Sequence, residues 1–516
     1  MVRMVIDQVG TQLSILEFLY LTNIGLLAIY GINALILAVL RIWRHKSIQI
    51  IDPDIDYDWP QVTVQLPIYN ERYVVERLIE SVSKLDYPRE RLQIQVLDDS
   101  TDITGDIISP LVADQQRRGF DIEHIQRDNR LGYKGGALAN GMQTAKGDFI
   151  AIFDADFLPP PDFLKRTLPY FDQDENTGCV QTRWGHLNRE NSLLTRTQAN
   201  GIDGHFIIEQ ETKSQAGLFL NFNGTAGIWR RKCVEDAGGW QHDTLTEDLD
   251  LSYRAQLGGW RICYLPHITT PAELPEHINA FKGQQFRWAK GSIQTAKKLL
   301  STLWRSSEPL LVKIEGTIHL THYAVHPLMI INLLLMLPLL LRGNYLLNIY
   351  PVFALAAIGP MFMYLTAMRK QDLPLIRRLF NLLMLVLLGM GLSWNNTRAV
   401  GEALLGIQTP FKRTPKFNLH DRQNAVKYLD YLLPKDGSMW LEALIGIYAL
   451  GLMLVAIIHG NWGLVFWLSL ISGGYGYVTI ISIRQSLEGR QRQTGTSVSE
   501  AIRISAQASS SNSGQD

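Results

Sequence analysis

Two pairs of acidic residues stand where metal chemistry would need them. Asp98 and Asp99 end one apolar run, and Asp154 and Asp156 end another, within AIFDADF. Hard divalent cations such as Mg²⁺ prefer carboxylate oxygens as ligands. Asp also tolerates turn conformations and often follows strands, so a turn explains each pair taken alone. The two pairs indicate chemistry only if the fold brings them together.

The polar region between residues 58 and 270 alternates strand-like runs with helix-like segments. This alternation predicts an α/β fold with a mostly parallel sheet covered on both faces. The expected strands are 62–67, 94–99, 121–126 and 149–156. The expected helices are 73–84, 103–118 and 131–145. Ligands of such sheets bind beyond the carboxyl ends of the strands, so both acid pairs are expected to face one cleft.

A cluster of carboxylates at one edge of a sheet is unfavourable unless positive charge joins it, and a divalent metal ion is the natural partner. Lys134 lies in the glycine-rich start of the helix expected at 131–145. It would add an ammonium group, and the helix start would add backbone N–H groups that suit phosphate. Together these features predict a site for a nucleotide diphosphate with Mg²⁺ or Mn²⁺.

A third acidic cluster opens the segment TLTEDLDLSYRAQLGGW. Thr246 is expected to be the N-cap of a helix, with Glu247 and Asp248 in its first turn, where carboxylates suit the helix dipole. Capping explains one acid here, but it does not explain three acids that include Asp250 as well.

The segment QQFRWAKG places three polar or aromatic side chains at helical spacing. Gln284, Arg287 and Trp288 can therefore face the same way from one helix. An interfacial membrane anchor is the alternative interpretation, because Trp and Arg both suit the interfacial layer.

The composition argues against other classes of protein. The 516 residues carry 49 basic and 49 acidic side chains, so the formal net charge is zero. A general nucleic-acid-binding protein is therefore not expected. Cys179, Cys233 and Cys263 are widely spaced and form no C-x-x-C pair, so neither a zinc site nor a disulfide framework is indicated.

Long apolar stretches predict an integral, multi-pass membrane protein. Residues 17–40 are long enough to cross a hydrocarbon core of about 30 Å, and no signal-cleavage site follows, so they are expected to be an uncleaved anchor. Further spans are expected at 316–341, 346–367, 437–459 and 461–484. The shorter stretch 381–394 favours an interfacial or re-entrant segment over a span.

Basic residues cluster after the first and third expected spans, before the fourth and after the fifth. The positive-inside tendency then predicts a cytoplasmic polar domain and C-terminus, with the N-terminus outside. The tail is rich in Ser, Gln and Gly, which favours disorder. The expected parts are an anchor (1–45), the α/β domain (58–270), interfacial helices (271–310), a transmembrane region (311–485) with a cytoplasmic loop near 408–420, and a disordered tail (486–516).

Four short motifs, taken in order, resemble the D, DxD, TED and QxxRW set of processive family 2 glycosyltransferases, which include cellulose, chitin and hyaluronan synthases. They are DD (98–99), DAD (154–156), TED (246–248) and QQFRW (284–288). Longer stretches, such as RDNRLGYKGGAL and FNGTAGIWR, resemble the plant cellulose synthase-like A and C branch and its bacterial relatives. The resemblance runs from about residue 60 to 420, which is most of the chain.

The resemblance implies a cytoplasmic GT-A (Rossmann-like) glycosyltransferase domain inserted between transmembrane helices. Asp99 would contact the nucleotide base or ribose, and Lys134 would contact the diphosphate. Asp154 and Asp156 would face the Mg²⁺ or Mn²⁺ ion, with Asp156 as the more direct ligand. Asp248 would be the catalytic base.

The remaining roles are also implied by the resemblance. Arg287 would stabilise the leaving diphosphate, and the acceptor would contact Gln284, Trp288 and Glu247. Glu71 and Lys416 would contact the nucleotide sugar. The segment FKRTPKF is similar to an F-x-V-T-x-K gating loop through Phe411, Thr414 and Lys416, with Arg413 at the position usually given to Val.

The implied reaction is inverting transfer of a hexose from GDP-mannose or UDP-glucose to a growing β-1,4-linked polysaccharide. The spans would form an export channel or serve only as an anchor. Two alternatives stay open: a lipid glycosyltransferase that makes a β-glycosyl-diacylglycerol or similar glycolipid, and a transporter whose soluble domain senses nucleotide. The expected partners are the donor, a polysaccharide or lipid acceptor and a bilayer of plasma- or Golgi-membrane type, without nucleic acid.

Overall fold

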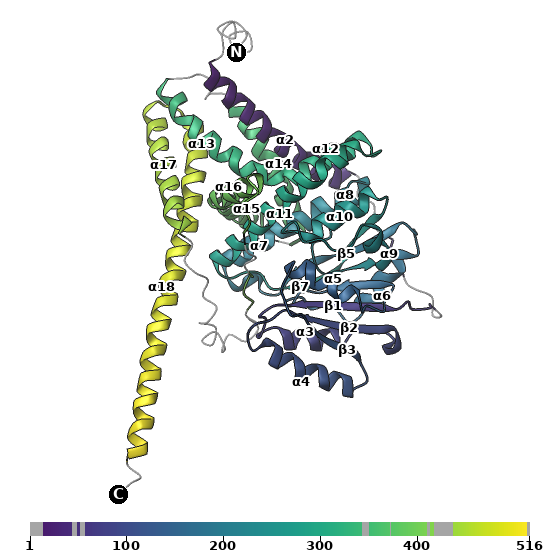
Figure 1. The fold of residues 1–516 in the computed structure, drawn as a ribbon. Helices are drawn as coiled ribbons and strands as arrows, with labels where there is room; N and C mark the ends of the chain where they lie inside the picture. The colour runs from purple at the N-terminus through teal and green to yellow at the C-terminus, as the bar shows by residue number, and fades with distance from the viewer. Residues whose placement is uncertain are drawn as a thin grey trace.

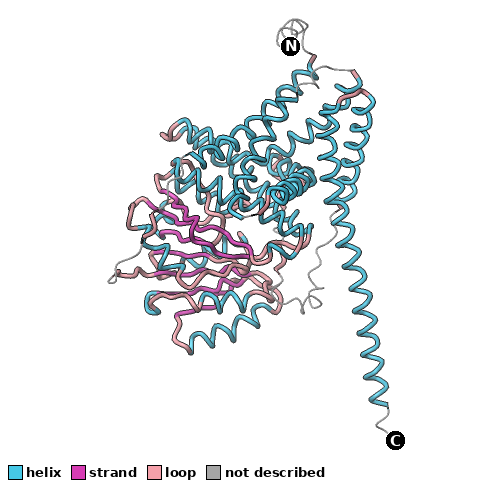
Figure 2. Tube along the Cα trace, turned by 180° about the vertical axis from the view of Figure 1, so that it is seen from behind, coloured by secondary structure: helices cyan, strands magenta, loops and turns pink. Residues whose placement is uncertain are grey.

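The structure, a computed structural model, has an α/β domain and a group of long helices, with further helices between them (Figure 1). It describes residues 14–43, 49–51, 57–342, 350–371, 373–409, 413–416 and 437–512, with the backbone alone over 350–356 and 488–512. The strands gather in one body, and the long helices lie to one side of it (Figure 2).

The α/β domain is built on a seven-stranded sheet with the strand order β3-β2-β1-β4-β6-β5-β7. The strands are β1 (Val62–Ile68), β2 (Leu92–Asp98), β3 (Asp121–Gln126), β4 (Phe149–Ile152), β5 (Thr177–His186), β6 (Gly227–Arg230) and β7 (Arg261–Ala272). β6 runs antiparallel to β4 and β5, and the other pairings are parallel. The predicted mostly parallel sheet is confirmed, and its first four strands fall where the sequence predicts them.

Buried polar side chains fix the register of β1 against β2. Thr63 donates to Oε1 of Gln93 over 2.8 Å, and Nε2 of Gln65 donates to Oε1 of Gln95 over 3.0 Å. Each pair is also a register pair of the two strands. A slip by one residue would leave buried amides without partners, so these contacts specify the alignment that places the two strand ends side by side.

Helices cover both faces of the sheet, as predicted. One face packs against α3 (Val75–Val82), α4 (Thr104–Arg117) and α6 (Phe163–Thr167), and the other against α5 (Tyr133–Met142), α9 (Arg231–Asp236) and α10 (Glu247–Leu257). Beyond β5, α7 (Leu193–Gly204), a π-helical turn (His205–Gln210) and α8 (Glu211–Ala216) follow. α7 contacts α14 and α15, so the β5 end of the sheet is the end nearest the long helices.

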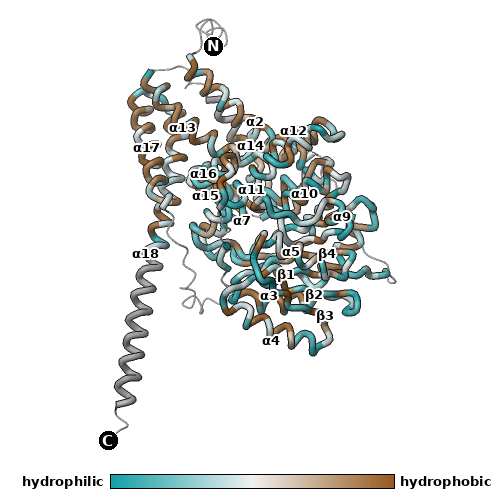
Figure 3. The backbone as a smooth tube through the Cα atoms, in the orientation of Figure 1, coloured by the Kyte–Doolittle hydropathy of each residue, from teal (hydrophilic) through white to brown (hydrophobic). Residues whose placement is uncertain are grey.

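The long helices are α2 (Ile15–Trp43), α11 (Ile278–Arg305), α12 (Leu310–Thr321), α13 (Val325–Leu341), α14 (Tyr350–Met368), α15 (Leu375–Gly391), α16 (Ser393–Leu404), α17 (Ser438–Ile458) and α18 (Trp462–Asn512). Four segments of the described chain are long and apolar enough to cross a membrane: Ile15–Trp43, Leu310–Leu341, Ser438–Ile458 and Trp462–Leu487. They form the brown stretches of α2, α13, α17 and upper α18 (Figure 3). Four predicted spans fall on these segments.

Two other predicted segments have different outcomes. The stretch 381–394 falls on α15 and α16, which are bent by 44° and form a broken span or a re-entrant loop. The predicted span 346–367 falls on α14, which is not among the four; its first residues have only a described backbone.

The C-terminal segment differs from its prediction. Disorder is expected from residue 486, but α18 continues as a helix to Asn512 and runs away from the rest of the chain (Figure 1). A helix forms its backbone hydrogen bonds within the segment, so the apolar first half of α18 nucleates it and a polar sequence can extend it.

Candidate active site

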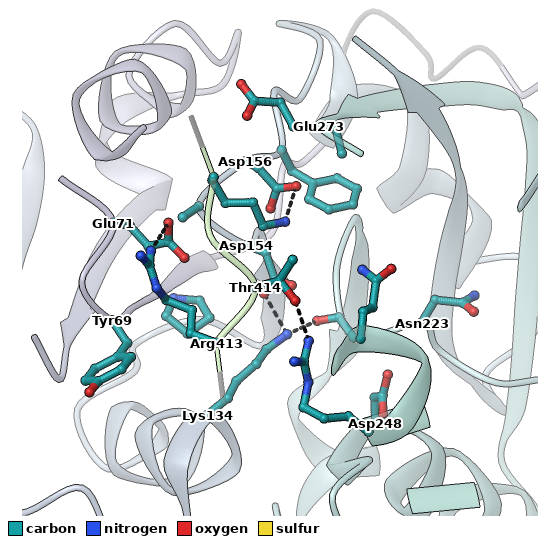
Figure 4. A pocket seen from close by; sticks show the side chains of 18 of the residues that line it. Tyr69, Glu71, Lys134, Asp154, Asp156, Asn223, Asp248, Glu273, Arg413 and Thr414 are labelled. Atoms are coloured by element: carbon teal, nitrogen blue, oxygen red, sulfur yellow. Dashed lines mark hydrogen bonds and ion pairs between the residues drawn. The ribbon is translucent and has the colours of Figure 1, made fainter. Parts of the chain in front are cut away.

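A pocket with a cavity volume of about 220 Å³ lies beyond the carboxyl ends of β1, β2 and β4. This is the edge at which the sequence predicts ligand binding. Eleven residues to which the sequence assigns a site role line this pocket: Glu71, Asp99, Lys134, Asp154, Asp156, Glu247, Asp248, Gln284, Arg287, Trp288 and Lys416. Segments far apart in the chain therefore converge on one cleft (Figure 4).

The first acid pair is split by the fold. Asp98 is the last residue of β2 and is buried, where it accepts from Ser100 N and pairs with His124 over 2.9 Å. Asp99 is beyond the strand and lines the pocket, where Arg127 donates to it. The expectation that both acids face the cleft is wrong for Asp98, because successive side chains at a strand end point to opposite sides.

Lys134 joins the second acid pair at the start of α5. Gly132 has φ of 74° and precedes the helix, a left-handed conformation that glycine adopts readily. Lys134 Nζ lies 2.6 Å from Oδ1 of Asp154 and donates to the Gly224 carbonyl over 2.8 Å. Burial lowers the pKa of Lys134, but the carboxylates of Asp154 and Glu247 outweigh burial and raise it, so the ammonium group stays charged.

The carboxylates of Asp154 and Asp156 fit a divalent cation whose other ligands come from the substrate and water. Lys134 Nζ contacts Asp154, and Lys416 Nζ lies 2.5 Å from Oδ2 of Asp156, so both carboxylates already attract positive charge. Among the described residues, no group of three or more His, Cys, Asp or Glu side chains could hold a metal alone. Mg²⁺ and Mn²⁺ sites of this kind are usually completed by substrate phosphates and water.

Asp248 lies at the start of α10, beside the segment that carries Gly224. A Cβ added at Gly224, whose φ is 82°, would lie 3.0 Å from Oδ2 of Asp248 and 3.3 Å from Nζ of Lys134. Burial, reinforced by the neighbouring charge of Glu247, raises the pKa of Asp248 to about 7. A carboxylate with a pKa near neutrality is suited to general-base chemistry.

The helix that carries Asp248 begins as predicted, but its cap differs. α10 starts at Glu247 after Thr246, and the Thr246 side chain makes no capping hydrogen bond. It faces α11 instead, where a Cβ at Gly291 would lie 2.5 Å from it. The glycine of QQFRWAKG therefore allows α11 to pack closely against the first turn of α10.

Gln284, Arg287 and Trp288 reach the pocket from α11, so their predicted common face is confirmed. Nη2 of Arg287 donates to the Thr414 hydroxyl over 2.8 Å. Burial lowers the pKa of Arg287 to about 10, which leaves the guanidinium charged near neutral pH.

The segment Arg413–Lys416 crosses the pocket (Figure 4). Nη1 of Arg413 lies 2.7 Å from Oε2 of Glu71, in addition to the Lys416 contact with Asp156. Burial raises the pKa of Glu71 to about 8 although Arg413 and Lys416 oppose the shift. Arg413, which stands where the resembled loop usually has Val, thus adds a second cation from this segment, beside Lys416, to the pocket. Phe411 lies outside the described residues.

Comparisons with known proteins identify the family of this chain. Residues 60–291 match the family model described as "Glycosyltransferase like family 2". The "Probable glucomannan 4-beta-mannosyltransferase 7" of Oryza sativa subsp. japonica is 32% identical over 409 residues, which cover 74% of this chain and 69% of that protein.

The chain belongs to glycosyltransferase family 2.

Two further similarities bear on this family 2 protein. "Glucomannan 4-beta-mannosyltransferase 1" of Oryza sativa subsp. japonica is 40% identical over 287 residues, 55% of this chain, and the chain spans about half (54%) of that relative. The solved "Mannosyltransferase PcManGT from Pyrobaculum calidifontis in complex with GDP-Man and Mn2+" matches with a TM-score of 0.54 and 20% identity, over 76% of this chain and 100% of that chain. This likeness supports the predicted GT-A-like fold.

Several pocket residues of the family 2 domain were not singled out from the sequence. The Arg130 guanidinium lies 3.2 Å from the centroid of the Tyr69 ring, at the same end as Asp99. Trp184 and His186 come from β5, for which no strand was predicted. Arg127 and Arg130 lie in the quoted stretch RDNRLGYKGGAL, so their position after β3 was the available signal.

Proposed function

We propose that the chain is an inverting glycosyltransferase that transfers mannose from GDP-mannose to the end of a β-1,4-linked glycan. The observation that carries this proposal is the pocket itself, where Asp154, Asp156 and Asp248 meet the cationic side chains of Lys134 and Arg287. The names of the rice relatives support mannose as the sugar. The donor is the sugar nucleotide named for the solved mannosyltransferase of the same fold.

The donor would lie across the sheet edge. Asp99 would bind the base or ribose at the β1–β2 end, and Lys134 would bind the diphosphate at the start of α5, where helix N–H groups also favour phosphate. Glu71 and Lys416 would complete the donor site. Asp154 and Asp156 would hold Mg²⁺ or Mn²⁺, which would supply charge stabilisation for the diphosphate.

The chemistry follows from the residues around Asp248. Its carboxylate would take the proton of an acceptor hydroxyl as that oxygen attacks the anomeric carbon. The bond from that carbon to the α-linked diphosphate breaks, and GDP leaves with the bonding electrons. Arg287 and Lys134 are preorganised to stabilise the charge that develops on the leaving group. One displacement inverts the centre and gives a β-linkage, while Gln284, Trp288 and Glu247 would hold the acceptor.

The long apolar helices support a multi-pass membrane enzyme. We place the α/β domain and the C-terminus on the cytoplasmic side because basic residues cluster in the segments that join them to the apolar stretches, and such segments tend to be cytoplasmic. The membrane would be of plasma- or Golgi-membrane type. The expected parts 1–45, 58–270, 271–310 and 311–485 would be the anchor, catalytic domain, interfacial helices and transmembrane region. Of the loop expected near 408–420, the described residues Arg413–Lys416 would lie over the donor. A glycan made on the cytoplasmic side would leave through a lined path between the helices.

A direct test uses full-length protein in lipid nanodiscs with labelled GDP-mannose and, separately, labelled UDP-glucose. The expected result is a polymer formed from GDP-mannose and cleaved by an endo-β-1,4-mannanase. The Asp248→Asn variant should bind GDP-mannose but form polymer at least about 10²-fold more slowly. Polymer formed from UDP-glucose alone would overturn the choice of donor.

The same assay decides the alternatives. A lipid glycosyltransferase would give an organic-soluble glycolipid, which the names of the rice relatives do not favour. A transporter that only senses nucleotide would consume no donor, and membership of a glycosyltransferase family opposes it.

A further inference from the structure

The pocket has two ends of different chemistry. The end over β1 and β2 carries the Asp99 carboxylate and the Arg130 guanidinium, which stacks on the Tyr69 ring. The opposite end is lined from β5, α7 and the segment after β7 by Trp184, His186, Ile202, Leu274 and Pro275. The strand order puts Asp154 and Asp156, which follow β4, between the two ends. If the nucleotide takes the first end, the second end faces the acceptor.

Polar side-chain atoms of the pocket lining are buried without partners, one of them on Trp184 at the second end. Nε1 of Trp184 and Oε1 of Gln284 are enclosed, yet neither makes a hydrogen bond to any described residue. The Trp184 ring packs edge-on to Phe157, which follows Asp156, at 5.2 Å between centroids. A buried donor or acceptor without a partner is costly, so a ligand that bonds to these atoms would be bound with selectivity.

His186 is held with one ring nitrogen engaged. Nε2 lies 3.2 Å from Oδ1 of Asp203, which also pairs with Arg189 and accepts from Nε2 of Gln371 over 3.1 Å. Burial raises the pKa of Asp203, but His186 and Arg189 outweigh it and lower the pKa, so this carboxylate is ionised. An ionised carboxylate only accepts, so Nε2 of His186 carries a proton towards Asp203. In the tautomer with its single proton on Nε2, Nδ1 is left to accept from a hydroxyl.

We propose that Trp184 and His186 form an acceptor subsite that binds a pyranose ring of the uncharged growing glycan, with Asp203 as the positioning residue of His186. The indole N–H donates to one hydroxyl, and Nδ1 accepts from another. Ile202, Leu274 and Pro275 contact the apolar face of the ring. The location agrees with this role, because α7 carries Ile202 and Asp203 and packs on α14 and α15, through which the product would leave.

This inference rests on the proposed function, but binding can be measured without transfer. The probe is β-1,4-mannohexaose, titrated calorimetrically into the donor-free, full-length protein in nanodiscs. Trp184→Phe keeps the ring and removes the N–H. Its matched control is Trp240→Phe, because Nε1 of Trp240 is also buried without a partner but lies outside the pocket lining.

Trp184→Phe and His186→Ala are expected to raise the Kd for the hexaose about five- to tenfold, as for the loss of one buried hydrogen bond, and to leave the Kd for GDP-mannose unchanged. Asp203→Asn should raise the KM for the hexaose in transfer assays and leave kcat unchanged, which a global folding defect would not do. Trp240→Phe should match the wild type.

Two results would overturn the subsite: wild-type hexaose affinity in Trp184→Phe, or loss of GDP-mannose affinity in equal proportion. Trp184→Phe carries this test by itself if His186→Ala does not fold. Wild-type protein that binds hexaose through Trp184 but transfers no sugar would refute the proposed function and keep the subsite. If the protein transfers sugar but Trp184→Phe and His186→Ala both leave its affinity for hexaose unchanged, only the subsite would be refuted.

Discussion

The rate of transfer should depend on pH through Asp248. Its pKa is raised to about 7, mainly by burial, and a general base acts only when deprotonated. Below pH 7, kcat/KM should therefore rise about tenfold per pH unit, and above pH 7 it should level off. Asp248→Asn should lower kcat by about 10²- to 10⁴-fold, the usual worth of general-base catalysis, and should abolish this pH dependence.

The same substitution should stabilise the free protein. The ordinary pKa of the Asp carboxyl is 3.8, and each pKa unit between that value and about 7 corresponds to about 1.4 kcal/mol, so ionised Asp248 destabilises the fold by up to about 4 kcal/mol. Because the folded-state pKa is raised, the penalty is full above pH 7 and fades towards pH 4. Asp248→Asn should accordingly have a higher Tm than the wild type at pH 8 and a smaller advantage at pH 5.

The assay is the initial rate of mannose transfer from GDP-mannose between pH 5 and 9, with Tm measured by scanning fluorimetry and GDP-mannose affinity by calorimetry. Asp236→Asn, an exposed acid on α9 outside the pocket, is the matched control and should behave as wild type. An Asp248→Asn variant that keeps more than about a tenth of the wild-type rate, or the same pH limb, would refute the assignment of the base.

Three further predictions test the metal, a helix contact and a buried ion pair. EDTA should abolish transfer, and added Mn²⁺ or Mg²⁺ should restore it; full activity in EDTA would contradict a metal-assisted site. Gly291→Ala should lower both Tm and activity because its Cβ would lie 2.5 Å from Thr246, whereas Gly283→Ala on the same helix meets nothing within 4 Å and should not lower Tm. Glu442→Gln should lower the free energy of unfolding by about 3–5 kcal/mol, seen as a fall in Tm, because it leaves the buried Lys282 ammonium without a counter-charge; an unchanged Tm would refute this contribution of the ion pair.

The sequence predicts the first half of the sheet well because each strand there is a short buried run that ends in a polar or glycine-rich segment. Val62–Ile68 and Asp121–Gln126 match their predicted ranges closely. The sequence predicts that Asp154, Asp156 and Lys134 lie together because ligands of parallel sheets bind at the edge where the strands end, a rule that requires no knowledge of side-chain packing.

The sequence could not predict contacts that depend on distant packing. Which of Asp98 and Asp99 faces the cleft depends on the residue at which β2 ends. β2 ends at Asp98, so Asp98 is buried against His124 and the next residue, Asp99, faces the pocket. The pairing of Arg413 with Glu71 joins residues that lie far apart in the sequence, so no local pattern indicates it. Thr246 looks like a cap by residue type, but the approach of α11 gives it a different neighbour.

A cryo-EM map of the full-length protein with GDP and Mn²⁺ would test the proposed donor site directly. We expect density for the diphosphate among Asp154, Asp156, Lys134 and Arg287, with Lys416 no longer paired with Asp156 alone. Diphosphate density elsewhere on the α/β domain would contradict the proposed donor site, because the acidic residues gathered in this pocket would then serve another purpose.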